Sequence, residues 1–144
     1  MRFHLFWLIV ILGVSGCAAK YEHNPNLAAQ KAEEFATLAF VKRDFDAAYG
    51  LLAESTQSHV PLAQFKQTLI KNQTEARPVK IVAKEYEPMP GEKAIYVFLT
   101  GENGSEQFSF RITMEGTAAS GYKVLRFDPG RFNLPGGERK KLPA

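Results

Sequence analysis

The sequence contains a single cysteine, three histidines and no long hydrophobic run. One cysteine excludes an intramolecular disulfide, and so few thiol and imidazole groups argue against a metal site built from them. The longest apolar stretch, near the N-terminus, spans about ten residues, whereas a membrane-crossing helix needs about twenty. The sequence therefore predicts neither a disulfide scaffold nor an integral membrane protein.

A strong excess of charge of either sign is also missing. Eighteen Lys and Arg oppose 15 Asp and Glu, for a formal net charge of +3. So small an imbalance does not indicate nucleic-acid binding. The chain has no internal repeat, and its 144 residues fit one domain. We expect no nucleic-acid partner and no cofactor.

The N-terminus, by contrast, is strongly patterned. A basic start with Arg2 precedes the apolar run Leu5–Leu12, and small residues follow it at 13–16. This is the three-part layout of a secretory signal. The pattern predicts that residues 1–16 form a signal peptide.

The end of that pattern is Val14-Ser15-Gly16-Cys17. It resembles the lipobox of bacterial lipoproteins, in which small residues separate a branched apolar residue from the cysteine. The resemblance implies cleavage between Gly16 and Cys17, a diacylglycerol thioether on Cys17, and a palmitate-type acyl group on the new amine. Two or more chains would anchor the protein stably to a membrane. The alternative is that Cys17 is a chance residue near an ordinary cleavage site, or a small buried hydrophobe.

The residue after the cysteine predicts which membrane of the envelope holds the protein. By resemblance to enterobacterial sorting, Ala18 in place of Asp favours the outer membrane, so we expect the chain on its periplasmic face. Residues 17–26 are polar and without periodicity, which predicts a short lipidated tether. His23, in that tether, is expected to be solvated.

Helical periodicity begins after the tether. Apolar residues recur every three to four positions over 27–41, with Asn24 and Pro25 as its start signal. Glu33 and Glu34 fall on the polar side of this predicted helix.

Two further helices are predicted before residue 72. Asp44 can cap a short second helix, and Val60-Pro61 opens a third with Phe65, Leu69 and Ile70 directed inward. The polar stretch "AESTQSH" between them is predicted to be a linker.

Beyond Lys71 the apolar period changes to two, which predicts four strands. They cover about residues 77–87, 93–100, 105–115 and 122–128, with an Asn-Gly hairpin at 103–104. The expected inward positions are Val79, Ile81, Ile95, Val97, Leu99, Phe108, Phe110, Ile112 and Met114. From residue 129 to 144 the chain is rich in Gly and Pro, which predicts a flexible C-terminal tail.

Three helices followed by four antiparallel strands predict an α+β domain over 27–128. "FVKRDFDAAYGLLAESTQSHVPLAQFKQTL" and the late "SGYKVLRFD" resemble small NTF2-like domains. The resemblance implies a cystatin-like cone, in which a curved antiparallel sheet wraps the helices and the mouth accepts a small ligand or a partner. Its motifs define a fold and assign no activity.

Enzymes of that superfamily place an Asp or His, sometimes with Tyr, inside the cone. None of the expected inward strand positions can transfer a proton, so we predict no catalytic residue. Tyr49 or His59 would serve an alternative enzyme of unknown substrate. Tyr49 and Phe110 are the candidate pocket residues, and no metal site is predicted, since only His23 and His59 remain once the signal is removed.

The outward positions of the second predicted strand are unusually apolar. Tyr96 and Phe98 would face away from the helices, where a solvated sheet face is normally polar. Either the protein's own tail covers them through Phe132 and Leu134, or a partner does. We therefore take Tyr96, Phe98 and Arg111 as the candidate contact surface for a homodimer or another envelope protein, with Arg126 as a further rim position.

Together these patterns predict a membrane-anchored envelope lipoprotein that acts without catalysis. It would bind a small apolar ligand in the cone or a protein on the sheet face. The alternatives are the enzyme mentioned above and a purely structural subunit of an envelope complex.

Overall fold

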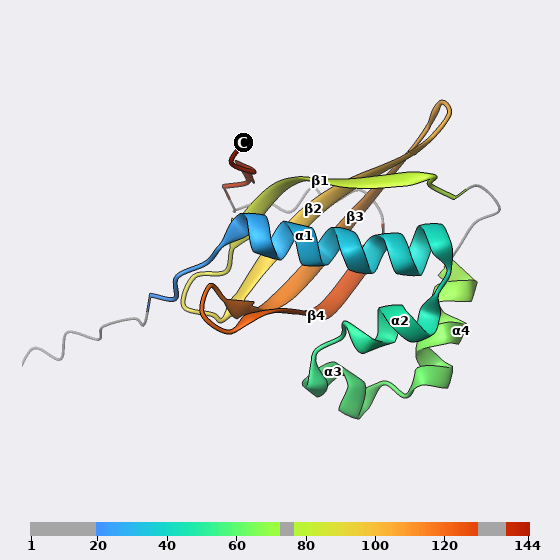
Figure 1. The fold of residues 1–144 in the computed structure, drawn as a ribbon, viewed down its shortest axis with the longest axis horizontal. Helices are drawn as coiled ribbons and strands as arrows, with labels where there is room; N and C mark the ends of the chain where they lie inside the picture. Colours follow the sequence, from blue (N-terminus) through green and yellow to red (C-terminus); the bar gives the residue numbers. More distant parts are fainter. Residues whose placement is uncertain (1–19, 73–76, 130–137) are drawn as a thin grey trace, which may run out of the picture.

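The computed structural model describes residues 20–72, 77–129 and 138–144. Within these ranges the protein is an α+β domain with helices packed on an antiparallel sheet (Figure 1). The helical elements are α1 (Pro25–Ala36), the π-helical turn η1 (Thr37–Lys42), α2 (Phe45–Gly50), α3 (Glu54–His59) and α4 (Leu62–Asn72). The strands are β1 (Lys80–Pro88), β2 (Ala94–Asn103), β3 (Glu106–Thr117), β4 (Gly121–Pro129) and β5 (Lys140–Lys141), in the order β4-β3-β2-β1-β5.

The first predicted helix forms and is capped as expected. The side-chain oxygen of Asn24 accepts a hydrogen bond from the Leu27 amide at 3.0 Å, and Pro25 occupies the first turn. The helix thus begins two residues earlier than its apolar pattern indicates. It continues into η1 and ends at Arg43, whose φ of 58° is left-handed.

The expected count of three helices is wrong, because "AESTQSH" is not a linker. Its residues form α3, which buries no side chain and so carries no apolar stripe. Polar contacts hold it instead: Thr56 Oγ1 donates to the Leu125 carbonyl at 2.8 Å, and Gln57 Nε2 donates to the Tyr49 carbonyl at 2.9 Å. Hydrophobic periodicity cannot detect a helix of this kind.

The four predicted strands form a meander. Their register places Val97 opposite Ile112 and Leu99 opposite Phe110, and the β2–β3 hairpin turns at Gly104 with φ 60°. The sheet is one strand wider than predicted, because Lys140 and Lys141 pair with Tyr86 and Glu85 of β1. Part of the expected loose tail is therefore ordered.

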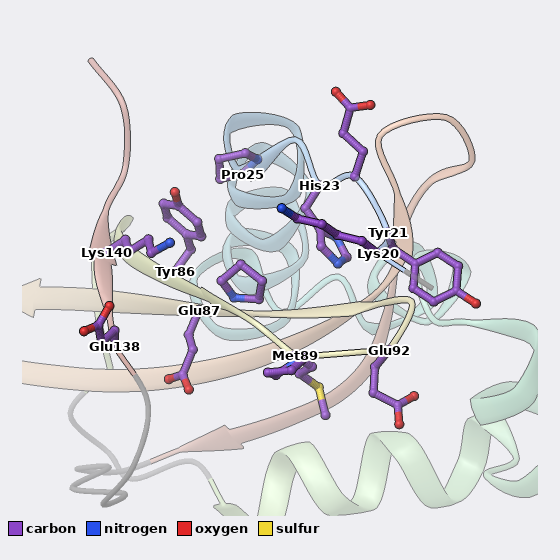
Figure 2. A pocket seen from close by; sticks show the side chains of 14 residues that line it. Lys20, Tyr21, His23, Pro25, Tyr86, Glu87, Met89, Glu92, Glu138 and Lys140 are labelled. Atoms are coloured by element: carbon purple, nitrogen blue, oxygen red, sulfur yellow. The ribbon is translucent and has the colours of Figure 1, made fainter. Parts of the chain in front are cut away.

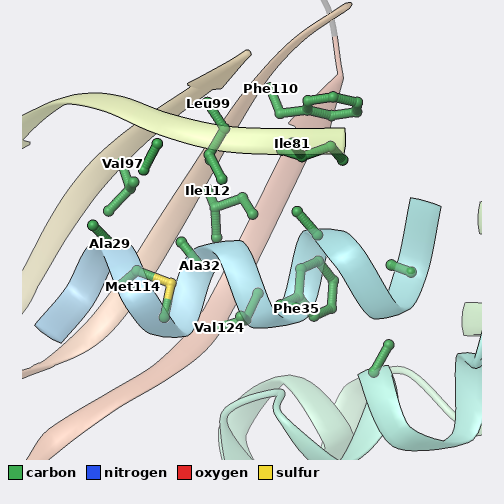
Figure 3. Packing of buried hydrophobic residues seen from close by; sticks show 14 of the residues in the cluster. Ala29, Ala32, Phe35, Ile81, Val97, Leu99, Phe110, Ile112, Met114 and Val124 are labelled. Atoms are coloured by element: carbon green, nitrogen blue, oxygen red, sulfur yellow. The ribbon is translucent and has the colours of Figure 1, made fainter. Parts of the chain in front are cut away.

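Helix α1 lies across one face of the sheet (Figure 1), and the core fills the space between them (Figure 3). Small residues such as Ala32, fully buried on α1, bring the helix close to the strands. Val79 and Ile70, both expected inside, are 64% and 52% exposed. Val79 precedes the first paired residue of β1, and Ile70 lies one position past the buried face of α4 marked by Leu69.

A polar contact joins α1 to the sheet. The register of β1 shifts between Ala83 and Glu85, and the Ala83 amide donates to Glu33 Oε1 at 2.6 Å. A strand irregularity leaves backbone groups without their regular partners, and the carboxylate satisfies one of them. Glu33 is thus half-buried, although the sequence pattern places it on the solvent side.

Candidate functional site

Packed aromatic rings occupy the interior between helices and sheet. Phe40 stacks on Phe110 with ring centroids 4.8 Å apart, and Tyr49 contacts Phe65 at 5.5 Å. Phe127 links the two pairs, at 5.9 Å from Phe40 and 6.1 Å from Phe65. The candidate pocket residues Tyr49 and Phe110 therefore belong to one aromatic cluster but lie at opposite ends of it.

Tyr49 and His59, the residues that would serve the alternative enzyme, form hydrogen bonds with groups close to them in the sequence. The Tyr49 hydroxyl donates to the Val60 carbonyl at 2.8 Å. The exposed His59 ring has Nδ1 2.8 Å from the Ser55 carbonyl oxygen and 3.0 Å from Ser58 Oγ. These contacts hold α3 and the segment that joins it to α4 in place.

The structure does bring together the three residues of the candidate contact surface. Tyr96 and Phe98 have ring centroids 6.4 Å apart, and the Arg111 guanidinium lies 5.1 Å from the Tyr96 ring. Phe98 is only 8% exposed, and the guanidinium of Arg139 lies 4.1 Å above its ring. The tail therefore covers part of this face through Arg139. Phe132 and Leu134, the residues named for the alternative in which the tail covers this face, lie outside the described residues.

Ion pairs complete this outer layer of the sheet. Arg111 Nη2 lies 2.9 Å from Asp128 Oδ2, and Arg126 reaches Asp128 Oδ1 at the same distance. The side chains of Arg111 and Asp128 are 12% and 16% exposed, so their pair is shielded from water. At the tail side, Arg139 Nη1 is 3.9 Å from Glu85 Oε2.

At the end of the domain where the chain enters, residues 20–24 are docked on the sheet. Tyr122 Oη accepts the Asn24 amide proton at 2.8 Å, and His23 Nδ1 lies 3.2 Å from the same oxygen. The Ala118 amide donates to the Glu22 carbonyl at 2.9 Å. The expectation that His23 is solvated is therefore wrong, because its half-buried ring stacks against Tyr122.

Tyr122 is a buried ionisable group that the sequence analysis overlooked. It is 5% exposed, and this burial raises the pKa of the Tyr122 hydroxyl, an effect that the Asn24 hydrogen bond partly opposes. The signal was present, since Tyr122 and the fully buried Val124 are two positions apart on one strand.

Beside the docked segment lies a pocket of about 810 Å³ (Figure 2). Its apolar lining comes from Tyr21, Pro25, Tyr86 and the Pro88–Pro90 turn. The remaining lining residues are Lys20, Glu22, His23, Glu87, Gly91, Glu92, Glu138 and Lys140. In Figure 2 the ammonium groups of Lys20 and Lys140 approach the pocket from opposite sides, whereas the carboxylates of Glu87 and Glu92 point away. Four glutamates and two lysines line the pocket, so the arrangement suits a molecule that has an apolar part and carries no net negative charge.

Neither a metal centre nor a membrane-spanning helix is present in the described part of the chain. Over 20–72, 77–129 and 138–144, no three His, Cys, Asp or Glu side chains gather closely enough to hold an ion, and no helix there is long and apolar enough to cross a bilayer. The predicted signal peptide and Cys17 lie outside these residues.

No protein-family model, curated protein or solved structure matches the chain significantly.

Proposed function

We propose that this protein is a lipid-anchored component of the bacterial cell envelope whose domain is a non-catalytic binding module. The Val14-Ser15-Gly16-Cys17 motif supports the anchor, with the outer membrane favoured by Ala18. The observation that carries the binding role is the pocket beside the docked N-terminal segment. Cys17 precedes the first pocket residue, Lys20, by only three positions.

The pocket is a better binding site than the interior expected from the resemblance. Aromatic rings fill the space between α1, α4 and the sheet. Phe110 is buried there and stacks on Phe40, and Tyr49 packs against Phe65. The pocket offers open volume next to Tyr86 and Pro25, with two lysines at its edge. An apolar surface combined with polar groups that can orient a ligand is typical of small-molecule sites.

We further propose that the domain is NTF2-like. Support comes from one long helix laid across the meander and shorter helices gathered at one end of it (Figure 1).

A protein partner on the outer sheet face is the second candidate function. It is favoured by Tyr96, whose ring stays half-exposed although Phe98 beside it is covered.

The anchor can be tested by expressing the full-length chain in bacterial cells and analysing the membrane-extracted product by mass spectrometry. We expect the wild type to begin at an acylated Cys17 and to enter the detergent phase. Cys17→Ser should retain the signal peptide and carry no lipid, whereas the matched Ser58→Ala change, at an exposed helix position, should behave as wild type. An unmodified Cys17 in the wild type would refute the anchor.

Binding in the pocket can be tested with a photo-crosslinking amino acid in place of Tyr86. We expect an adduct of added small-molecule mass when the crosslinker is at residue 86, and none when it replaces the exposed Gln107 on β3. Equal adducts, or none, at the two positions would argue against the pocket as the binding site.

A further inference from the structure

We infer that His23 determines the specificity of the pocket, and that its Nε2–H group donates a hydrogen bond to the carbonyl oxygen of an uncharged, largely apolar ligand. This inference rests on the binding role proposed above for the pocket. It adds a ligand class and the protein group that selects it.

The buried hydroxyl of Tyr122 has one proton to donate. Tyr122 Oη accepts the Asn24 amide proton at 2.8 Å, and His23 Nδ1 lies 3.2 Å from the same oxygen. Burial raises the pKa of Tyr122, so the hydroxyl keeps its proton at neutral pH. Among the residues that the structure describes, His23 Nδ1 is the only acceptor in contact with this hydroxyl. The hydroxyl of Tyr122 therefore donates its proton to Nδ1.

This contact determines which ring nitrogen of His23 carries a proton. An uncharged imidazole has one N–H group and one acceptor nitrogen. If Nδ1 carried the proton, it would donate to Tyr122 Oη, and the hydroxyl proton of Tyr122, a residue that is only 5% exposed, would have no acceptor. A buried donor without an acceptor costs free energy, so Nδ1 is the acceptor and Nε2 is the protonated nitrogen.

The protonated Nε2 of His23 is available to a ligand. His23 lines the pocket (Figure 2), and its half-buried ring stacks on Tyr122 with an angle of 29° between the two rings. Over residues 20–72, 77–129 and 138–144, Nε2 has no hydrogen-bond partner. Because Tyr122 holds the ring in one orientation, Nε2–H is a preorganised donor. Such a donor favours a ligand that offers an acceptor over an analogue that lacks one.

The rest of the lining favours an uncharged ligand. Four glutamates against two lysines disfavour an anion. The ammonium groups of Lys20 and Lys140 approach the pocket while the carboxylates of Glu87 and Glu92 point away, which disfavours a cation (Figure 2). The apolar lining suits an aromatic or hydrocarbon body. A carbonyl oxygen on such a body is the uncharged acceptor that matches Nε2–H of His23.

The tautomer can be measured by nitrogen NMR of the full, processed chain with isotope-labelled histidine, at about pH 8, where a free imidazole is uncharged. The variant His23→Phe assigns the signals. We expect His23 to have an unprotonated Nδ1 and a protonated Nε2. Tyr122→Phe removes the hydroxyl and keeps the ring, so it should convert this single form into a mixture of tautomers. A wild-type His23 protonated at Nδ1 would overturn the inference.

The ligand class is tested with benzophenone, an uncharged aromatic ketone that forms covalent adducts on illumination, at a concentration well below saturation. We expect adducts on wild-type peptides that contain residues 20–25 or 86–92. His23→Phe keeps an aromatic ring and removes the donor, so it should lower the adduct yield about twofold to tenfold, as for the loss of one neutral hydrogen bond. The matched change His59→Phe, on α3 and outside the pocket, should leave the yield unchanged.

The outcomes separate this inference from the proposed function. If the crosslinking amino acid at residue 86 captures no small molecule and benzophenone forms no adduct, the binding role of the pocket and this inference both fail. Capture at residue 86 without benzophenone adducts, or with equal adducts in wild type and His23→Phe, overturns this inference alone. If His23→Phe does not fold, the wild-type tautomer decides, because a protonated Nδ1 leaves no donor for the ligand.

Discussion

The two faces of the central strand β2 are covered in different ways. Ile95, Val97 and Leu99 point toward α1 and are at most 1% exposed. Phe98, pointing the other way, is 8% exposed, and it is covered by the guanidinium of Arg139 from the chain's own tail. An apolar outer position on a strand therefore does not by itself indicate a partner protein, because long cationic side chains can cover it.

The difference also concerns the source of stability. The inner face is stabilised by the burial of apolar surface and by close packing, and both depend little on salt. The outer face depends on cation–π contacts and on ion pairs around Asp128. We expect substitutions on the inner face to cost more and to respond less to ionic strength.

The largest effect is expected from Phe35→Ala. This ring is fully buried and contacts Phe40, Phe65 and Phe127. Truncating such a side chain leaves a cavity and should lower the free energy of unfolding by about 3–5 kcal/mol. Urea denaturation measures the change.

Val79→Ala, at a position 64% exposed, is the matched control and should change the free energy of unfolding by less than about 0.5 kcal/mol. If the two substitutions lowered the free energy of unfolding by similar amounts, packing on the inner face could not be the main source of stability.

A smaller effect is expected from Asp128→Asn on the outer face. Asp128 accepts hydrogen bonds from Arg111 and Arg126, and hydrogen bonds to charged groups contribute about 1.5–3 kcal/mol. We expect a loss of about that size in urea denaturation, and high salt should reduce the part contributed by Arg126, whose side chain is 70% exposed.

The control is Asp46→Asn, whose carboxylate is 68% exposed and pairs with Lys66; exposed pairs contribute at most about 1 kcal/mol. A loss for Asp128→Asn no larger than the control's would contradict a shielded ionic layer on the outer face.

The sequence predicted the inner face well because burial there follows periodicity. The alternation of Phe108, Phe110, Ile112 and Met114 identified both the strand and its buried side. The caps Asn24 and Asp44 were also correctly identified, since capping needs only neighbouring residues.

The features that the sequence did not reveal are held by contacts between distant residues. Arg139 covers Phe98 from 41 positions away, α3 is held by polar bonds to β4, and His23 meets Tyr122 across 99 residues. No local pattern encodes such pairings. The pocket at the N-terminal end was missed for the same reason, because it exists only where 20–25, the β1–β2 turn and the tail meet.

The smallest expected effect comes from Tyr122, and it depends on pH. Tyr122→Phe removes the hydroxyl that accepts the Asn24 amide, a neutral hydrogen bond that contributes about 0.5–1.5 kcal/mol. Burial raises the pKa of Tyr122 above its ordinary 10.0, so above that pH the unfolded chain loses this proton before the folded one does. Folded wild type should therefore lose stability as pH rises from about 10 through the raised pKa, and Tyr122→Phe should lack this part of the slope.

Tyr96→Phe, on the outer face, is the control, and thermal melts between pH 8 and 11 are the measurement. An identical alkaline slope in Tyr122→Phe and wild type would mean that the docked N-terminal segment does not keep this hydroxyl buried in solution.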